Sequence, residues 1–151
     1  ITRIFNMIDK IDDEILRLLA KNGRITLSEL AKKVNLSISP CQARLKKLEN
    51  KKYILGYHAR INYEQLQKAH IAFVQVVLSD TRASALENFN SEVSKLESIE
   101  QCHMIAGSFD YLLKVRTKNI SQYRTILAEK ISSLPNVSST STFVSMETIK
   151  D

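Results

Sequence analysis

The chain has 151 residues, of which 44% are hydrophobic and 25% are charged, a composition typical of a globular protein with one domain or two small ones. Only three glycines occur, and Gly23, Gly56 and Gly107 stand too far apart to form a phosphate-binding loop, so P-loop and dinucleotide-binding motifs are excluded. The net charge is +6, and no apolar run approaches the roughly 18 residues of a membrane span.

The positive charge is concentrated in the first part of the chain. Residues 1–60 contain 13 Lys and Arg against six Asp and Glu, whereas residues 61–151 contain nine against ten. This asymmetry favours a basic module that binds a polyanion, followed by a near-neutral module with another task. The alternative is a basic surface that only keeps the protein soluble.

No pattern in the sequence points to an enzyme. Cys41 and Cys102 form no C-x-x-C pair, the three histidines form no metal-binding motif with them, and no G-x-S-x-G motif occurs. We therefore expect no catalytic residues, no metal and no cofactor. Two isolated cysteines are typical of a reducing compartment, which indicates the cytoplasm.

Two short helices are predicted near the start of the chain. The first begins after Asp9, with acidic residues in its first turn where the helix dipole favours them, and it ends at Gly23. The second begins at Thr26, because Glu29 stands three residues later and completes a capping box.

A third helix is predicted from Ser37 or Ser39 to about Asn50, with Pro40 in its first turn. Its apolar stripe consists of Ile38, Cys41, Leu45 and Leu48. Two short helices joined by a tight turn, with another helix bracing them, form a helix-turn-helix.

The face of the third helix opposite this stripe carries hydroxyl, amide and basic side chains. Hydroxyls and amides can reach the edges of bases, while cations bind phosphates. The residues predicted to contact double-stranded DNA are Ser37, Ser39, Gln42, Ala43, Arg44, Lys46 and Lys47. The alternative is an ordinary amphipathic helix whose basic face is only solvated.

The rest of the chain is predicted to form strands and helices in the order βαββαβ, after a connecting strand over residues 53–61. The strands are predicted at 71–79, 99–106, 111–117 and 137–147, and the helices at 82–96 and 119–134. This order predicts an α+β, ferredoxin-like domain with four antiparallel strands and two helices on one face. The other face then needs cover, and because a second copy of the chain would supply it, we expect a dimer.

Five segments match one protein family in order and spacing. They are Ile8–Asp12, Asn22–Ile25, Ser37–Leu45, Gly107–Lys114 and Leu134–Val137. From about residue 8 to residue 150, the chain closely resembles the leucine-responsive regulatory protein/AsnC family of transcription regulators. With this resemblance, we expect a helix-turn-helix domain over residues 1–52, a linker strand and hinge over 53–66, and a ferredoxin-like ligand-sensing and dimerisation domain over 67–151.

The resemblance also implies an assembly and an effector. Family members form dimers that associate into tetramers or larger assemblies on the nucleoid in the cytoplasm, and a small molecule, usually an amino acid, binds where dimers meet. The residues implied in effector binding are Met104, Gly107, Ser108, Phe109, Asp110, Arg124, Thr140, Ser141 and Thr142. The chain departs from the family pattern at Ile38, where proline is common, and at Ser108, where an acidic or second polar residue is common.

The chemistry of residues 107–110 is compatible with an amino-acid site. A bound amino acid needs N–H donors for its carboxylate and an acceptor for its ammonium group, because burying either charge unpaired is costly. Gly107 permits close approach of the backbone, and Asp110 supplies an acceptor. Alternatively, both residues only shape a hairpin turn, and Arg124 is only a solvated helix residue.

The sequence leaves three candidate functions for this chain. The first is a sequence-specific transcription regulator whose assembly or DNA affinity changes with an amino-acid effector. The second is an effector-independent nucleoid-organising protein. The third is a small ferredoxin-like enzyme, for which the sequence offers no nucleophile with its base, no metal set and no cofactor loop. We expect the first, with no membrane partner.

Overall fold

The computed structural model describes residues 8–150. The chain divides between Arg60 and Ile61 into two compact units, a helical unit and a sheet unit, and each is described by itself. This division falls inside the connector predicted at residues 53–66. Residues 1–7 of the predicted DNA-binding domain and residue 151 of the predicted C-terminal domain lie outside the described residues. Within the described part, no helix is long and apolar enough to cross a membrane.

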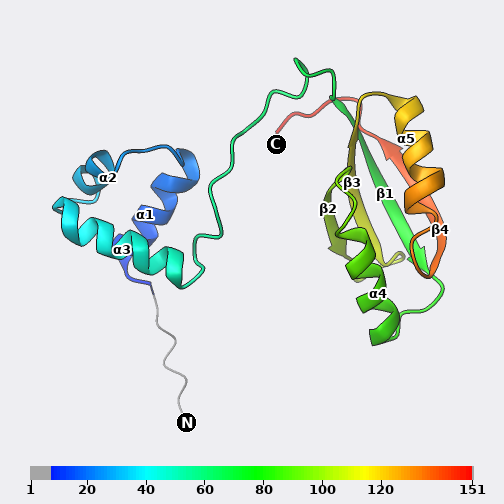
Figure 1. The fold of residues 1–151 in the computed structure, drawn as a ribbon, viewed down its shortest axis with the longest axis horizontal. Coiled ribbons are helices and arrows are strands. Elements are labelled where there is room, and N and C mark those ends of the chain that lie inside the picture. Colours follow the sequence, from blue (N-terminus) through cyan, green and yellow to red (C-terminus); the bar gives the residue numbers. More distant parts are fainter. Residues whose placement is uncertain (1–7, 151) are drawn as a thin grey trace, which may run out of the picture. The chain divides into compact units, whose positions relative to one another are not determined.

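The helical unit is built from three helices, and the first two begin after the residues predicted to cap them. They are α1 (Lys10–Lys21), α2 (Leu27–Lys33) and α3 (Ile38–Asn50) (Figure 1). Asp9 caps α1 by accepting a hydrogen bond from the N–H of Asp12 at 2.8 Å. At the start of α2, the Thr26 hydroxyl accepts from the N–H of Glu29, and the Glu29 carboxylate accepts from the N–H of Thr26. The capping-box prediction is confirmed.

The turn between α2 and α3 depends on Asn35, whose φ is 54°. Asparagine tolerates this left-handed conformation, which lets the N–H of Leu36 reach the carbonyl of Ala31 at 2.9 Å. The buried core residues of the unit are Ile15, Leu30, Ala31, Val34, Cys41 and Leu48.

The predicted apolar stripe of α3 is wrong at one position. Ile38 is 52% exposed. The core is centred on Cys41 and Leu48, and at about 100° per residue Ile38 lies about 70° round the helix from their mean direction. Its side chain therefore stands beside the core and not in it.

The sheet unit contains its elements in the predicted βαββαβ order. They are β1 (His70–Leu78), α4 (Ala83–Val93), β2 (Ile99–Met104), β3 (Tyr111–Thr117), α5 (Ile120–Ile126) with its π-helical continuation η1 (Leu127–Ile131), and β4 (Val137–Val144). The four strands form one antiparallel sheet in the order β2-β3-β1-β4. The ferredoxin-like prediction is confirmed.

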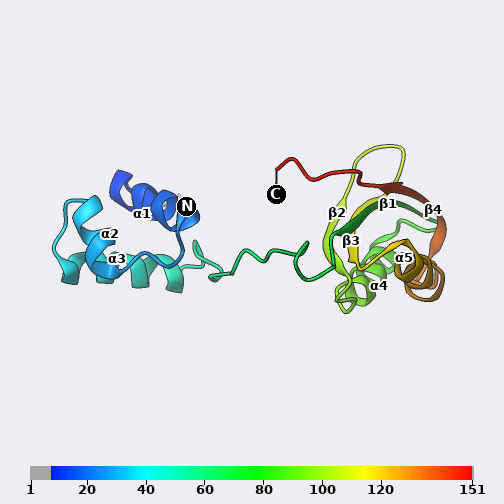
Figure 2. The same ribbon diagram turned by 90° about the horizontal axis from the view of Figure 1, so that it is seen from above.

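α4 and α5 cover the same face of this sheet (Figure 2). On that face, Val74 and Val76 of β1 are fully buried in a core that includes Phe89 of α4. On the other face, Phe73 is 37% exposed, and its partner in register on β4, Phe143, is 53% exposed. A single copy of the chain therefore leaves an apolar pair open to solvent.

The expected linker strand over residues 53–61 is absent from the structure. A strand needs a neighbour that pairs with it, and none of the described strands of this chain pairs with this segment. On each side of the division at residue 60, the chain instead contacts its own unit. Tyr57 donates its hydroxyl to Glu49 Oε1 at 2.9 Å, and the Arg116 guanidinium carbon lies 4.0 Å from the centre of the Tyr63 ring.

Candidate DNA-binding and effector-binding sites

The outer face of α3 presents polar side chains to solvent. Ser39, Gln42, Ala43 and Lys46 are all exposed, as their spacing predicts. Ser37 occupies the N-cap position, yet its side chain makes no capping hydrogen bond, so its hydroxyl is available to a ligand. Hydroxyl, amide and ammonium groups on one helix face are the combination that contacts DNA.

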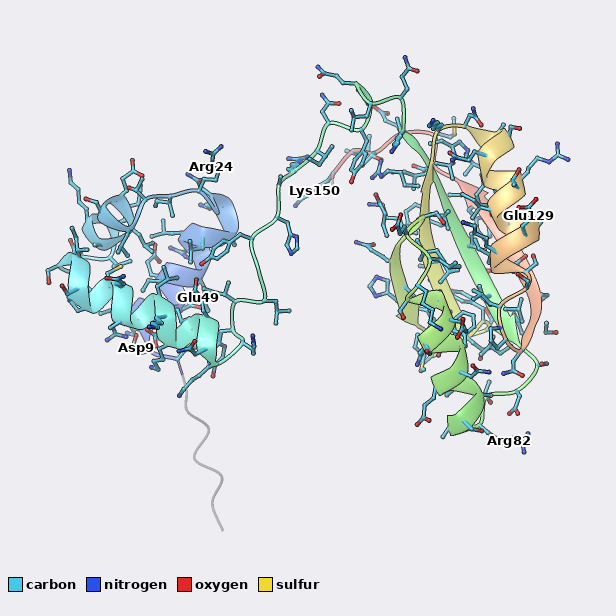
Figure 3. All side chains as sticks on the ribbon, viewed as in Figure 1. Asp9, Arg24, Glu49, Arg82, Glu129 and Lys150 are labelled. Atoms are coloured by element: carbon cyan, nitrogen blue, oxygen red, sulfur yellow. The ribbon has the colours of Figure 1, made fainter. Side chains whose placement is uncertain are left out.

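Arg44 and Lys47 differ from these residues, because both contact α1. Arg44 Nη1 lies 2.5 Å from Asp9 Oδ2 and 2.7 Å from Asp12 Oδ1, and Figure 3 shows Asp9 beside α3. Lys47 Nζ lies 3.3 Å from Asp12 Oδ2, while the lysine side chain remains 45% exposed. Arg44 thus joins α3 to α1, whereas Lys47 keeps part of its side chain in solvent.

The carboxylate of Asp12 is fully buried, so its charge must be compensated. Burial raises the pKa of this carboxyl, but the hydrogen bonds from Arg44 and Lys47 outweigh burial and hold the pKa below its ordinary value. The pKa of Asp9 is also lowered, first by the hydrogen bond from the N–H of Asp12 and then by that from Arg44. Both carboxylates are therefore negative at neutral pH and tie α3 to α1.

Further cations lie near the turn and on α2. Lys32 and Lys33 are exposed in the last turn of α2, and Arg24 points outward between α1 and α2 (Figure 3). In helix-turn-helix proteins, the helix before the recognition helix crosses the phosphate backbone, so these residues are candidate phosphate contacts. No motif in the sequence marks these residues, and Lys32 and Lys33 are also explained by the helix dipole, which favours basic residues in the last turn of any helix.

The loop predicted to bind an effector, residues 107–110, joins β2 to β3, and Asp110 anchors it to β1. Asp110 Oδ2 accepts a hydrogen bond from the N–H of Leu78 at 2.7 Å, and the N–H of Asp110 donates to the Val76 carbonyl at 2.9 Å. Asp110 therefore does shape the hairpin. Its carboxylate is half-buried, and Oδ1 accepts no hydrogen bond from residues 8–150, which leaves this oxygen available to a ligand.

Gly107 is exposed, and its φ lies outside the left-handed region. A Cβ at this position would lie 3.5 Å from Ile105 Cγ2, an ordinary van der Waals distance. Nothing within the described chain therefore requires glycine here. A requirement for glycine would come from a group that approaches the loop from outside. Of the other two loop residues, Ser108 is exposed and Phe109 is half-buried.

The hydroxyl residues of β4 divide between the two faces of the sheet. Thr140 and Thr142 lie on the helix side, because their partners on β1, Val76 and Val74, belong to the core. There Thr142 Oγ1 lies 2.5 Å from the hydroxyl of Tyr123. The side chain of Thr142 therefore contacts α5 on the helix side of the sheet.

Ser141 lies on the open face of the sheet. It stands opposite Gln75 of β1, and Gln75 in turn stands opposite Leu112 of β3. Gln75 is absent from the predicted effector residues, since one amide in an otherwise apolar strand forms no motif. Its half-buried side chain adds a polar group between Ser141 and the strand that follows the 107–110 loop.

The remaining predicted effector residues are not brought together in one copy. Arg124 is exposed on α5 and lines an open cavity of about 550 Å³ beside that helix. A second cavity of about 470 Å³ lies between α4 and the end of η1. Neither cavity is lined by residues 104–110, and Met104 is 57% exposed at the end of β2. Among residues 8–150, no three His, Cys, Asp or Glu side chains gather to hold a metal ion.

In the comparison with known proteins, two family models match separate parts of the chain. The winged helix-turn-helix DNA-binding family matches residues 8–54, and the Lrp/AsnC ligand binding domain matches residues 71–151. The proline dehydrogenase transcriptional activator of Rhizobium radiobacter is 55% identical over 144 residues, which cover 95% of this chain and 92% of that protein. The leucine-responsive regulatory protein of Klebsiella pneumoniae is 44% identical over 143 residues, which cover 95% and 87%.

A solved structure agrees with these relatives. The transcriptional regulator of Neisseria meningitidis in complex with L-Met matches with a TM-score of 0.88 and 30% identity, over 96% of this chain and 94% of that one. The matched families define a DNA-binding transcription regulator with a ligand-binding domain, not an enzyme. The chain belongs to the Lrp/AsnC family of transcription regulators, as the sequence resemblance implied.

Proposed function

We propose that this chain binds operator DNA through the outer face of α3 and regulates a gene of amino-acid catabolism in the cytoplasm. The observation that carries the proposal is the exposed polar face of α3 in a winged helix-turn-helix unit. Ser39 and Gln42, with Ala43 directly after Gln42 in the sequence, contact base edges, while Ser37 and Lys46 bind phosphates. The exposed part of Lys47 adds a phosphate contact, and Arg44 acts indirectly by holding α3 on α1.

The proposed effector is an amino acid that binds at the 107–110 loop. Asp110 Oδ1 meets its ammonium group, the backbone N–H groups beside Gly107 meet its carboxylate, and Ser141 adds a hydroxyl. Met104 and Phe109 contribute apolar contacts, and Ser108, Arg124, Thr140 and Thr142 remain proposed members of the site. The named relatives support this class of ligand, because one is a complex with L-Met and another is a leucine-responsive regulator.

Proline is the effector that we propose first. The relative that is 55% identical over 144 residues is named as an activator of proline dehydrogenase. An enzyme that consumes proline is usefully made only when proline is present, so proline is the natural signal for its gene. We accordingly propose a proline dehydrogenase gene as the first target.

The proposed assembly is a dimer that associates further into a tetramer or larger complex of dimers. The open face of the sheet, with Phe73 and Phe143, supplies the apolar surface for the dimer. The linker strand over residues 53–61 forms in that dimer, because the second copy provides the neighbouring strand that a single chain lacks. The effector loop then lies where dimers meet, and a residue such as Arg124 reaches the site from another copy.

Calorimetric titration with each amino acid tests the effector site. We expect proline to bind the wild-type protein, and we expect Asp110→Asn to weaken this binding at least tenfold. Asparagine retains an oxygen that accepts from the N–H of Leu78 but lacks the charge that pairs with ammonium. Gly107→Ala should leave the melting temperature unchanged or slightly raised and should also weaken binding. The matched control is Asp80→Asn, at another aspartate of the same unit, which should bind proline as the wild type does.

The second candidate function is an effector-independent nucleoid-organising protein. The observation that favours it is the use of Asp110 in the hairpin, where its carboxylate already accepts from the N–H of Leu78. If no amino acid binds the wild type at millimolar concentration, this second function replaces the first. If proline binds wild type and Asp110→Asn equally, the effector site lies elsewhere in the protein.

A further inference from the structure

An exposed isoleucine stands at the first position of α3. Ile38 is 52% exposed, whereas Cys41, Leu45 and Leu48, the other apolar residues of the predicted stripe, are buried in the core or packed against it. Scattered apolar residues are ordinary on protein surfaces. This one is notable for its position, because it begins the helix that carries the proposed DNA contacts, and the inference drawn from it rests on that proposed function.

Ile38 lies on the same side of α3 as two of the proposed base contacts. At about 100° per residue, Gln42 lies about 40° from Ile38 round the helix, and Ser39 lies about 100° from it. All three side chains are exposed. The N-terminal turn of a recognition helix is the part that contacts base edges in the major groove. Ile38, Ser39 and Gln42 therefore form one exposed surface at the N-terminal end of α3.

The chemistry of an aliphatic side chain selects one feature of the major groove. Isoleucine cannot form a hydrogen bond with a base, but thymine presents an apolar C5-methyl group there, and no other base of DNA does. The amide of Gln42, one helical turn away, is suited to N6 and N7 of adenine. We propose that Ile38 packs on a thymine methyl group and selects thymine at one position of each half-site, beside the base that Gln42 contacts.

The surroundings of Ile38 favour DNA over a protein partner. A protein that docks on this surface would need an apolar patch, yet the exposed neighbours Ser37, Ser39 and Gln42 are all polar. A single isoleucine among hydroxyl and amide groups instead matches the edge of a base pair, which offers one methyl group among hydrogen-bonding atoms.

A change of one methyl group in the DNA tests the contact. The probe is the duplex that the wild-type protein recovers most often from a random-sequence pool, with each thymine replaced in turn by deoxyuridine, which lacks only the C5-methyl group. Loss of one buried methyl contact should weaken binding about fourfold. We expect this loss at one thymine in each half-site with the wild type, no loss there with Ile38→Ala, and a partial loss with Ile38→Val.

Two controls separate this contact from general effects. Ile120 is 51% exposed and begins α5 in the other unit, so Ile120→Ala should respond to deoxyuridine as the wild type does. Ile38→Ala should keep the wild-type melting temperature, because the side chain lies outside the core. The proposal is overturned if no thymine is sensitive, or if the sensitive thymine weakens Ile38→Ala and wild type equally. If the wild type recovers no preferred sequence from the pool, the proposed sequence-specific function fails as well, which distinguishes the two failures.

Discussion

At the scale of single residues, the buried carboxylate of Asp12 determines how the DNA-binding face is held. It lies in the first turn of α1 and receives Arg44 and Lys47 from successive turns of α3. A buried ion pair of this kind adds little net stability by itself, but removing one partner leaves the other charge uncompensated. Asp12 is therefore a positioning residue for α3, and the cations that it holds are partly withdrawn from the DNA.

The ion pairs of Asp12 predict a specific pH dependence. The pKa of Asp12 is lowered in the folded state, so its contribution is fully present above the unfolded value near 3.8 and is lost as pH falls through the folded pKa. At pH 7, Asp12→Asn should reduce the stability of the α1–α3 packing by about 1–2 kcal/mol, less than for a fully buried pair, because Arg44 keeps its contact with Asp9 and Lys47 is 45% exposed. This difference from the wild type should shrink as the pH falls below about 4.

Hydrogen–deuterium exchange of the α1 and α3 amides, corrected for the intrinsic effect of pH, measures this difference. The matched control is Asp13→Asn, at the exposed neighbouring residue, which should change protection only slightly at either pH. Equal protection of wild type and Asp12→Asn at pH 7 would show that the buried carboxylate does not hold the helices together.

At the scale of elements, local patterns were sufficient for most of the fold. The caps at Asp9 and Thr26 predicted the starts of α1 and α2, and the strand predicted at residues 111–117 has the observed bounds of β3, Tyr111–Thr117. These features are encoded by neighbouring residues, so the sequence shows them directly.

Three features of the structure could not be predicted from local sequence patterns. The strand predicted over residues 53–61 is absent, because none of the described strands of this chain pairs with that segment. The Arg44 side chain contacts α1 through Asp9 and Asp12, which lie 35 and 32 residues earlier in the sequence. No local spacing encodes such contacts. Helical periodicity assigned Ile38 to the core by sequence spacing, but it could not show that the core of a three-helix unit ends before this residue.

The exposed face of α3 predicts the effect of charge removal on DNA binding. Lys46 is exposed, so Lys46→Ala should weaken binding to all sequences and reduce the slope of log K against log salt by about one unit. Lys47→Ala should have a smaller effect, because Lys47 also contacts Asp12. Fluorescence anisotropy at several salt concentrations measures both slopes. Lys130→Ala in the sheet unit is the matched control, and an unchanged slope in Lys46→Ala would remove this face from the interface.

At the scale of the whole molecule, the open face of the sheet predicts self-association. The fragment of residues 61–151 has its own core and should sediment as a dimer at micromolar concentration without DNA. Phe73→Asp should yield a monomer, because it places a charge in the apolar surface that the dimer buries. Ile120→Asp, at an exposed residue of the helix layer, is the control and should remain dimeric. A wild-type fragment that sediments as a monomer would contradict the proposed assembly.

We propose that an amino acid bound in the sheet unit changes DNA binding by the helical unit. A ligand shifts such an equilibrium only by the difference in its affinity for the two states, typically about 5- to 150-fold. The direct measurement titrates labelled DNA from upstream of a proline dehydrogenase gene with the full-length protein, with and without proline. We predict that proline shifts the wild-type isotherm at least fivefold in affinity or changes its stoichiometry, and that Asp110→Asn binds the same DNA without responding. Identical wild-type isotherms with and without every amino acid at millimolar concentration would contradict the claim.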